Sequence, residues 1–190
     1  MTTYQLSLPP QTIDGAAPGP RPHLEQAQRQ FGFVPNMYAF MAQQPGLLET
    51  YVAGYDAFRA DSGFTPPEQE VVLLTISRDN RCGYCVAAHS MVGAQMTGVP
   101  AAVLAALRAD QPLPDPRLAA LSRFTSAMVA SRGNPTPVEA DAFLAAGFTE
   151  RHVLAVVLAI SVKTISNYAN HVFRTPVDAA FAAFTWTPAT

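Results

Sequence analysis

Two cysteines, Cys82 and Cys85, stand three residues apart directly after a break at Asp79-Asn80-Arg81. An apolar helix is expected from about Tyr84 to Met96, so this cysteine pair falls at a helix start. Unsatisfied backbone N–H groups and the helix dipole favour an anion there, which lowers a thiol pKa from its free value of about 8.5. Because the thiolate is the nucleophilic form of cysteine, the position predicts a reactive sulfur.

Two further titratable residues can serve the cysteine pair. His89 follows Cys85 by four residues, a spacing that places both side chains on one face of a helix. Glu70 lies near the start of the preceding helix, and only the fold can bring it to the cysteines. If Glu70 is partly buried, desolvation raises its carboxyl pKa into the range of a general base. The neighbouring Glu68 is assigned to helix capping, and Glu70 to the chemistry.

These residues, in this order, resemble the active-site signature of the AhpD-like alkylhydroperoxidases of the carboxymuconolactone decarboxylase superfamily. The resemblance implies an all-helical AhpD-like bundle, a homo-oligomer (trimer or hexamer), and no metal, haem or other cofactor. The matching stretches are Glu70, Cys82-Gly83-Tyr84-Cys85, Val86-Ala87-Ala88-His89, and upstream Gly32-Phe33-Val34-Pro35-Asn36 and Gln44-Pro45-Gly46-Leu47-Leu48.

The resemblance also implies a mechanism. Glu70 is the base of a proton relay that runs through His89 to Cys85. Cys85 attacks a hydroperoxide and becomes a sulfenic acid, and Cys82 then condenses with it to form a disulfide. An external dithiol or a thiol-carrying reductant protein restores the pair. The peroxidase members carry a histidine where this chain has Tyr84, whose phenol is a poorer proton carrier; Tyr84 is therefore expected to shape the pocket.

Other interpretations of the same residues stay open. The cysteines could be two small buried residues, or Cys82, Cys85 and His89 could bind zinc with Glu70 as the fourth ligand. Cys-Gly-Tyr-Cys after an apolar run also resembles the redox loop of thioredoxin relatives, a fold that requires strands. A decarboxylase of the same superfamily would need an anion-binding pocket instead of the thiols, and an oligomeric scaffold would need neither.

Composition limits the class of protein. The 190 residues are 49% hydrophobic and 14% charged, with a formal net charge of −2. That apolar content is enough to bury one core, and the low charge favours burial against sister subunits. No Lys/Arg run is present to neutralise nucleic-acid phosphates. The longest apolar runs, 71–76 and 153–160, are too short to span a bilayer, and residues 1–22 lack the features of an export signal, so a cytoplasmic protein is expected.

Helix signals dominate from residue 23 onward, which predicts one all-helical domain over 23–190 preceded by an extended Pro/Gly-rich arm over 1–22. Thr65-Pro66-Pro67-Glu68 and Thr136-Pro137-Val138-Glu139 are capping boxes. The run 71–76 fits a strand as well as a helix, and the upstream capping box favours helix. Further helices are predicted at 24–31, 37–43, 46–59, 101–109, 117–131 and 176–184.

Residues 63–84 resemble residues 147–168, and both segments open with Gly-Phe-Thr. This similarity predicts an internally duplicated helical hairpin, of which only the first copy carries the reactive groups. In the second copy Glu70, Cys82, Cys85 and His89 are replaced by Leu154, Ser166, Ala169 and Phe173. A separate polar cluster near the C-terminus is assigned to helix packing or to an interface: Asn167, Asn170 and His171.

Overall fold

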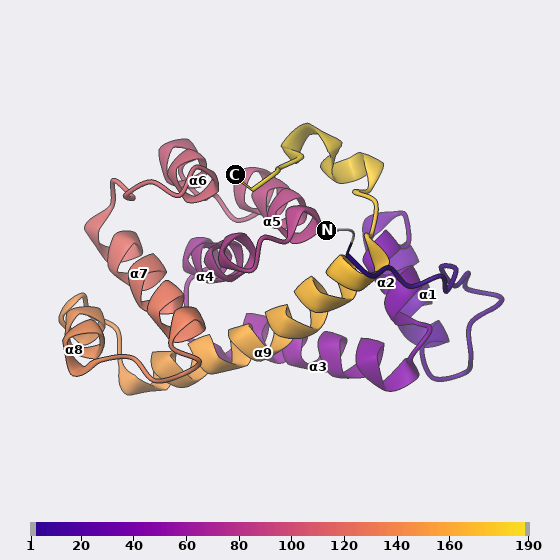
Figure 1. Cartoon of the computed structure of the whole chain (residues 1–190), viewed down its shortest axis with the longest axis horizontal. Coiled ribbons are helices and arrows are strands. Elements are labelled where there is room, and N and C mark those ends of the chain that lie inside the picture. The colour runs from indigo at the N-terminus through magenta and orange to yellow at the C-terminus, as the bar shows by residue number, and fades with distance from the viewer. Residues whose placement is uncertain (1–2, 189–190) are drawn as a thin grey trace.

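Residues 3–188, which the computed structural model describes, form helices and no strand (Figure 1). The all-helical prediction is confirmed, and a thioredoxin fold is excluded because it requires a sheet. The helices are α1 (Arg21–Phe31), α2 (Asn36–Met41), α3 (Pro45–Asp61), α4 (Pro66–Asp79), α5 (Gly83–Gln95), α6 (Ala101–Arg108), α7 (Pro116–Ala130), α8 (Pro137–Ala145), α9 (Glu150–Phe173) and the 3-10 helix η1 (Ala179–Phe184).

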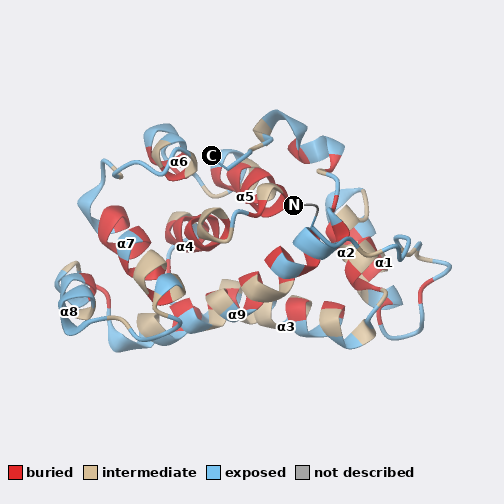
Figure 2. Ribbon diagram, in the orientation of Figure 1, coloured by how far each residue is buried: buried red, intermediate tan, exposed pale blue. Residues whose placement is uncertain are grey.

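Helix α4 is the centre of the fold. It packs against α5, α6, α7 and α9, which surround it in Figure 1. Every residue from Glu68 to Ser77 is buried, as the red ribbon of Figure 2 shows. A helix that is buried on all sides needs no polar face, which explains why the run 71–76 fitted a strand equally well. The helix prediction for this run is confirmed, and it carries Glu70 into the core.

The predicted helix starts are present. Capping boxes open α4 at Thr65 and α8 at Thr136. In the first of these, the backbone N–H of Thr65 donates to Glu68 Oε2 at 2.9 Å. Helix α5 begins at Gly83, and Cys82 is its extended N-cap residue. The cysteine pair therefore occupies a helix start, as the sequence predicted.

The two segments that open with Gly-Phe-Thr also begin alike in the structure. Gly63 and Gly147 have positive φ values of 77° and 91°. The threonine that follows in each segment, Thr65 or Thr149, begins a capping box. The similarity of the two segments therefore has a structural counterpart at their helix starts.

The second segment does not form the expected hairpin. Helix α9 runs unbroken from Glu150 to Phe173, whereas the first segment breaks between α4 and α5. The break depends on Arg81, which adopts a left-handed φ of 58°. The corresponding residue of the second segment is Ile165, and a β-branched side chain strongly disfavours that conformation. The first copy thus turns back at the cysteine pair, and the second continues as one long helix.

The C-terminal tail differs from the predicted helix over 176–184. Only Ala179–Phe184 is helical, as a 3-10 turn. Asp178 before it is extended, with its carboxylate turned inward to accept the backbone N–H of Asn36 at 3.1 Å. This contact ties the tail to the start of α2. At the other end of the chain, α1 begins at Arg21, just inside the expected arm, and residues 3–20 contain no helix.

Helix α9 is the one helix of residues 3–188 that is long and apolar enough to suit a membrane span. It packs against α2, α3, α4, α5 and α7, so it contacts helices from both halves of the chain. Figure 1 shows it running beside α3 along one edge of the molecule. Core helices of globular proteins have the same length and composition, so these two properties are weak evidence for a membrane span.

Candidate active site

The cysteine pair is enclosed between α5 and α9. Cys82 is 1% exposed and Cys85 is 2% exposed, and both are free thiols. One amide group contacts both sulfurs: Asn170 Nδ2 lies 3.3 Å from Cys85 Sγ and 3.8 Å from Cys82 Sγ. Ser166 Oγ, one turn earlier on α9, lies 3.9 Å from Cys85 Sγ. The break before α5 therefore presents the sulfurs to a polar face of α9.

The surroundings of the two sulfurs make them chemically different. Burial alone would raise the pKa of Cys85, but a hydrogen bond from Cys82, the charge of Lys163, His89 and the Ser166 hydroxyl together lower it well below its usual value. The pKa of Cys82 is raised by its hydrogen bond to Cys85 and by burial. These surroundings favour the thiolate on Cys85 and the thiol on Cys82.

Glu70 and His89 are brought together, although they lie on different helices. Glu70 is completely buried on α4, and its Oε2 lies 2.9 Å from His89 Nδ1 on α5. The other oxygen of Glu70 is paired with Arg59 of α3. Arg59 also donates to the hydroxyl of Tyr55 at 2.6 Å. The fold thus builds a buried chain Arg59–Glu70–His89 whose last member lies one turn after Cys85.

The expected rise in the pKa of Glu70 is wrong. Burial does raise it, but His89 and Arg59 outweigh the burial and lower the pKa below its usual value. The pKa of His89 is lowered by burial and by Lys163, against the opposing effect of Glu70. At neutral pH the carboxylate is ionised and the imidazole is neutral. His89 Nδ1–H therefore donates to Glu70, which leaves Nε2 as the free acceptor.

Tyr84 does not face an open pocket. Its hydroxyl donates to Asp178 Oδ2 and accepts the backbone N–H of Met37 at 3.4 Å. Burial and the carboxylate of Asp178 raise the pKa of the phenol. Its ring meets that of Phe181 in the tail at a centroid distance of 6.0 Å. The central residue of the Cys-Gly-Tyr-Cys motif thus fastens the C-terminal tail to α5 and α2.

Sequence reasoning missed three residues that belong to the site. Asn170 was assigned to packing, yet its amide contacts both sulfurs. Arg59 had no motif around it. Lys163 is the only lysine of the chain and interrupts the apolar stretch of α9, a signal that could have flagged it. Of the other members of the C-terminal polar cluster, Asn167 packs as expected and accepts from Asn80 at 3.0 Å. His171 is exposed and stacks on Tyr168 of its own helix, so its assignment to an interface stays a prediction.

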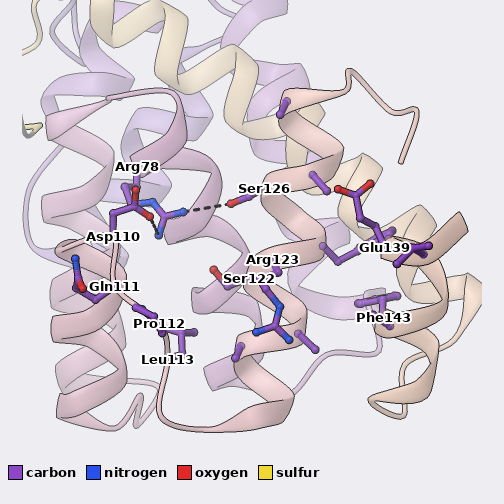
Figure 3. Close-up of a pocket in the computed structure, with 17 residues that line it drawn as sticks. Arg78, Asp110, Gln111, Pro112, Leu113, Ser122, Arg123, Ser126, Glu139 and Phe143 are labelled. Carbon is purple, nitrogen blue, oxygen red and sulfur yellow. Dashed lines mark hydrogen bonds and ion pairs between the residues drawn. The ribbon is translucent and has the colours of Figure 1, made fainter. Parts of the chain in front are cut away.

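Two cavities of the structure are not lined by the cysteines. A groove of about 710 Å³ is bordered by α7, α8 and the connection after α6, with Arg78, Asp110, Arg123 and Phe143 in its wall (Figure 3). It includes none of the four predicted catalytic residues. A smaller pocket of about 60 Å³ is lined by Tyr38 and Tyr55. The ring of Tyr55 lies 6.3 Å from that of His89, so this pocket is the nearer one to the cysteines.

The zinc alternative finds no support in the geometry. Within the described part of the chain, no three His, Cys, Asp or Glu side chains converge as metal ligands would. Glu70 directs one oxygen to Arg59 and the other to His89, so neither oxygen faces the sulfurs.

Comparison with known proteins identifies the fold. No family model matches the sequence, and no curated protein does. The alkylhydroperoxidase AhpD core of a peroxidase-related protein from Ralstonia eutropha JMP134 matches with a TM-score of 0.83 at 22% identity, over 96% of this chain and 97% of that one. A peroxidase-related protein from Silicibacter sp. TM1040 matches at 0.74 and 23% identity, over 95% and 97%. The debrominase Bmp8, as a cysteine-to-alanine variant with 2,3,4-tribromopyrrole, matches at 0.76 and 16% identity, over 95% and 96%. The chain therefore has the AhpD-like fold that its sequence predicted.

Proposed function

We propose that the chain is a thiol-dependent peroxidase that reduces small hydroperoxides through the Cys82–Cys85 pair. The observation that carries the proposal is the asymmetric placement of the two sulfurs. Asn170 Nδ2 lies 3.3 Å from Cys85 Sγ and 3.8 Å from Cys82 Sγ, and Ser166 contacts Cys85. The pKa of Cys85 is lowered by Cys82 and its other neighbours, and that of Cys82 is raised. Such a pair has a nucleophile and a resolving group already assigned.

The reaction begins with attack of the Cys85 thiolate on one oxygen of the hydroperoxide. The O–O bond breaks, Cys85 becomes a sulfenic acid, and the leaving alkoxide takes a proton to form the alcohol. The Cys82 thiol then attacks the sulfenic sulfur, and water leaves as the disulfide forms. An external dithiol or a thiol-carrying protein reduces this disulfide by exchange, which returns Cys82 as a thiol and Cys85 as a thiolate with release of a proton.

His89 is suited to relay the proton that the alkoxide needs, which its neutral imidazole first takes up from water at Nε2. Its Nε2 is free because Nδ1–H is held by Glu70. When Nε2 is protonated, the ionised Glu70 stabilises the imidazolium, and Arg59 keeps Glu70 ionised. In this proposal Glu70 orients and supports His89 instead of acting as the base expected from the family resemblance.

Enclosure of the sulfurs favours a small substrate. With Cys82 and Cys85 at 1% and 2% exposure, hydrogen peroxide or a short alkyl hydroperoxide needs a smaller opening to reach Cys85 than a bulky substrate does. Tyr55 lines the small pocket and its ring lies 6.3 Å from that of His89, so its side chain is the proposed gate between the two. A bulky lipid hydroperoxide would require the tail or α2 to move.

The test compares C85S and C82S with the parent. Peroxide consumption with dithiothreitol as reductant should be lost in C85S, and a dimedone adduct should form on Cys85 in C82S after one equivalent of peroxide. Peroxide turnover in C85S at the parent's rate would refute the proposal. An activity that survives alkylation of both thiols would favour the decarboxylase alternative instead.

A second candidate substrate comes from the fold comparison. The debrominase Bmp8 binds 2,3,4-tribromopyrrole, and the rings of Tyr38, Tyr51 and Tyr55 form an aromatic cluster near the cysteines here. The same variants should therefore be assayed for bromide release from 2,3,4-tribromopyrrole. Bromide release that requires Cys85, without peroxide turnover, would replace the peroxidase proposal.

The expected trimer or hexamer stays a prediction. Helix α9 exposes several large apolar side chains, including Leu154 at 69% and Tyr168 at 59%. Burial of this face in a homo-oligomer would account for them. Light scattering coupled to size-exclusion chromatography tests the assembly, and a monomer at micromolar concentration would contradict it.

A further inference from the structure

Lys163 lies in the interior of the protein, where lysines are rarely found. Its side chain lies on α9, and the residue is completely buried. Its Nζ has no hydrogen-bond partner among the described residues 3–188. Removing an ammonium group from water costs several kcal/mol unless an opposite charge compensates it. A charge placed here needs a counter-charge nearby.

The periodicity of α9 directs Lys163 toward the cysteine pair. Ser166 and Asn170 follow it at helical spacings of three and seven residues, which places all three on one face. Ser166 and Asn170 both contact Cys85. The charge of Lys163 acts on Cys85, on Cys82 and on His89. The lysine therefore belongs to the same polar wall that faces the sulfurs.

The charges around this wall leave one partner for Lys163. Glu70, the buried carboxylate of α4, is already engaged by Arg59 and His89. His89 carries no negative charge in either protonation state. Of the two thiols at the start of α5, Cys85 is the one whose pKa is lowered, so it is the group that can be an anion beside the lysine.

We infer that Lys163 is a positioning residue of the dithiol, whose buried ammonium is the counter-charge that selects Cys85 over Cys82 as the thiolate. This inference deepens the proposed function, but it concerns the thiols alone and is tested without peroxide. The helix start contributes only a partial charge of about half a unit. The full charge of Lys163 acts on both thiols, but it lies on the face of α9 whose Ser166 and Asn170 approach Cys85 more closely than Cys82, so its effect should be larger on Cys85.

Oxidation removes this counter-charge. When the disulfide closes, Cys85 is no longer an anion and the ammonium of Lys163 stands alone in the core. The dithiol form is thus favoured over the disulfide, which makes the disulfide a stronger oxidant toward an external dithiol. Lys163 would in this way help the reductant to reset the pair after each turnover.

The first test uses the absorbance of the thiolate at 240 nm. It is titrated in C82S and in C82S/K163M, where Cys85 is the only thiol. Loss of the charge should move the titration of Cys85 to higher pH. K163M in a C85S background should move the titration of Cys82 less. The control is C82S/T125V, since Thr125 is also fully buried with an unpartnered hydroxyl but lies on α7. Equal titrations of C82S and C82S/K163M would overturn the inference.

A second test needs no substitution at Lys163. The chain has one lysine, so lysine labelled at Cε gives one side-chain NMR signal. In the reduced protein this signal should shift at the same pH as the 240 nm absorbance, and this inflection should persist in C82S and vanish in C85S. A lysine chemical shift that does not change as Cys85 titrates would overturn the inference, even if K163M fails to fold.

The third measurement is the thiol–disulfide equilibrium with dithiothreitol. With both cysteines present, K163M should shift the equilibrium constant at least tenfold toward the disulfide, which corresponds to about 30 mV for this two-electron couple. K163R, which keeps the charge, should show a smaller shift than K163M. An unchanged constant in a folded K163M would contradict the proposed role, whatever the peroxidase assay shows.

Discussion

Glu70 Oε2 lies 2.9 Å from His89 Nδ1, and the two residues come from consecutive helices that meet at the break before Cys82. Replacing Glu70 by Gln keeps the size of the side chain but removes the charge that supports a protonated His89. We expect E70Q to lower the rate of Cys85 oxidation by hydrogen peroxide at least about tenfold. Stopped-flow measurement of the reduced protein gives this rate directly.

The control for this variant lies two residues earlier on the same helix. Glu68 accepts from Thr65 and from Arg117 Nε at 2.8 Å, away from the cysteines. E68Q should lower the free energy of unfolding by about 1 kcal/mol through the weakened cap, with no change in the oxidation rate. Equal rate losses in both variants would show that E70Q acts through stability alone.

Acid should destabilise the fold through His89. Burial and Lys163 hold the folded-state pKa of His89 below its usual value of about 6.5. Between these two pKa values the unfolded chain binds more protons than the folded protein. The contribution of neutral, buried His89 to the free energy of unfolding is therefore complete above about pH 6.5 and is lost as the pH falls toward the folded-state pKa. The urea midpoint should therefore fall between about pH 7.5 and 5.5, and less so in H89N. H171N, at an exposed histidine, should behave as the parent.

Asn170 offers a test of charge at the sulfurs. N170D has the same shape but places a carboxylate where the amide now faces Cys85 and Cys82. The like charge should raise the pKa of Cys85 and reduce the thiolate population at neutral pH. N170A loses the same donor without adding a charge. Alkylation by iodoacetamide should therefore be slowest in N170D, and equal rates in the two variants would argue against an anionic Cys85.

Tyr84 should matter for stability more than for chemistry. Y84F removes the hydrogen bond to Asp178, which still accepts the backbone N–H of Asn36. We expect a loss of about 1–2 kcal/mol in the free energy of unfolding, measured in urea. The rate of Cys85 oxidation should change less than about twofold, because the phenol faces the tail instead of the sulfurs. A rate loss as large as that of E70Q would assign Tyr84 to the proton path.

Local signals predicted the part of the site that lies within one stretch of chain. The cap at Thr65, the helix start at Cys82 and the spacing of Cys85 and His89 all depend on neighbours a few residues away, and all were correct. The pKa of Glu70 was wrong because its partner Arg59 lies on another helix and carries no motif. Burial could be foreseen from the apolar run, but the charge that counters burial could not.

The polar wall of Lys163, Ser166 and Asn170 on α9 could not be predicted for the same reason, because its partners lie on another helix. Asn170 was seen as polar, yet a helix of Ala, Val and Leu gives no indication of which side meets the cysteines until the packing is known. The absent second hairpin is different, since its cause is local. Ile165 stands where the first segment has Arg81 in a left-handed conformation, which a β-branched side chain disfavours, but the conformation of Arg81 became known only from the structure.

The complete burial of Lys163 also bears on how this protein can be handled. Since no other lysine exists in the chain, the folded molecule presents no lysine amine to acylating dyes, cross-linkers or activated surfaces. A reagent that modifies Lys163 must act on molecules in which α9 has separated from its neighbours. The speed of that modification therefore reports how often the interior opens.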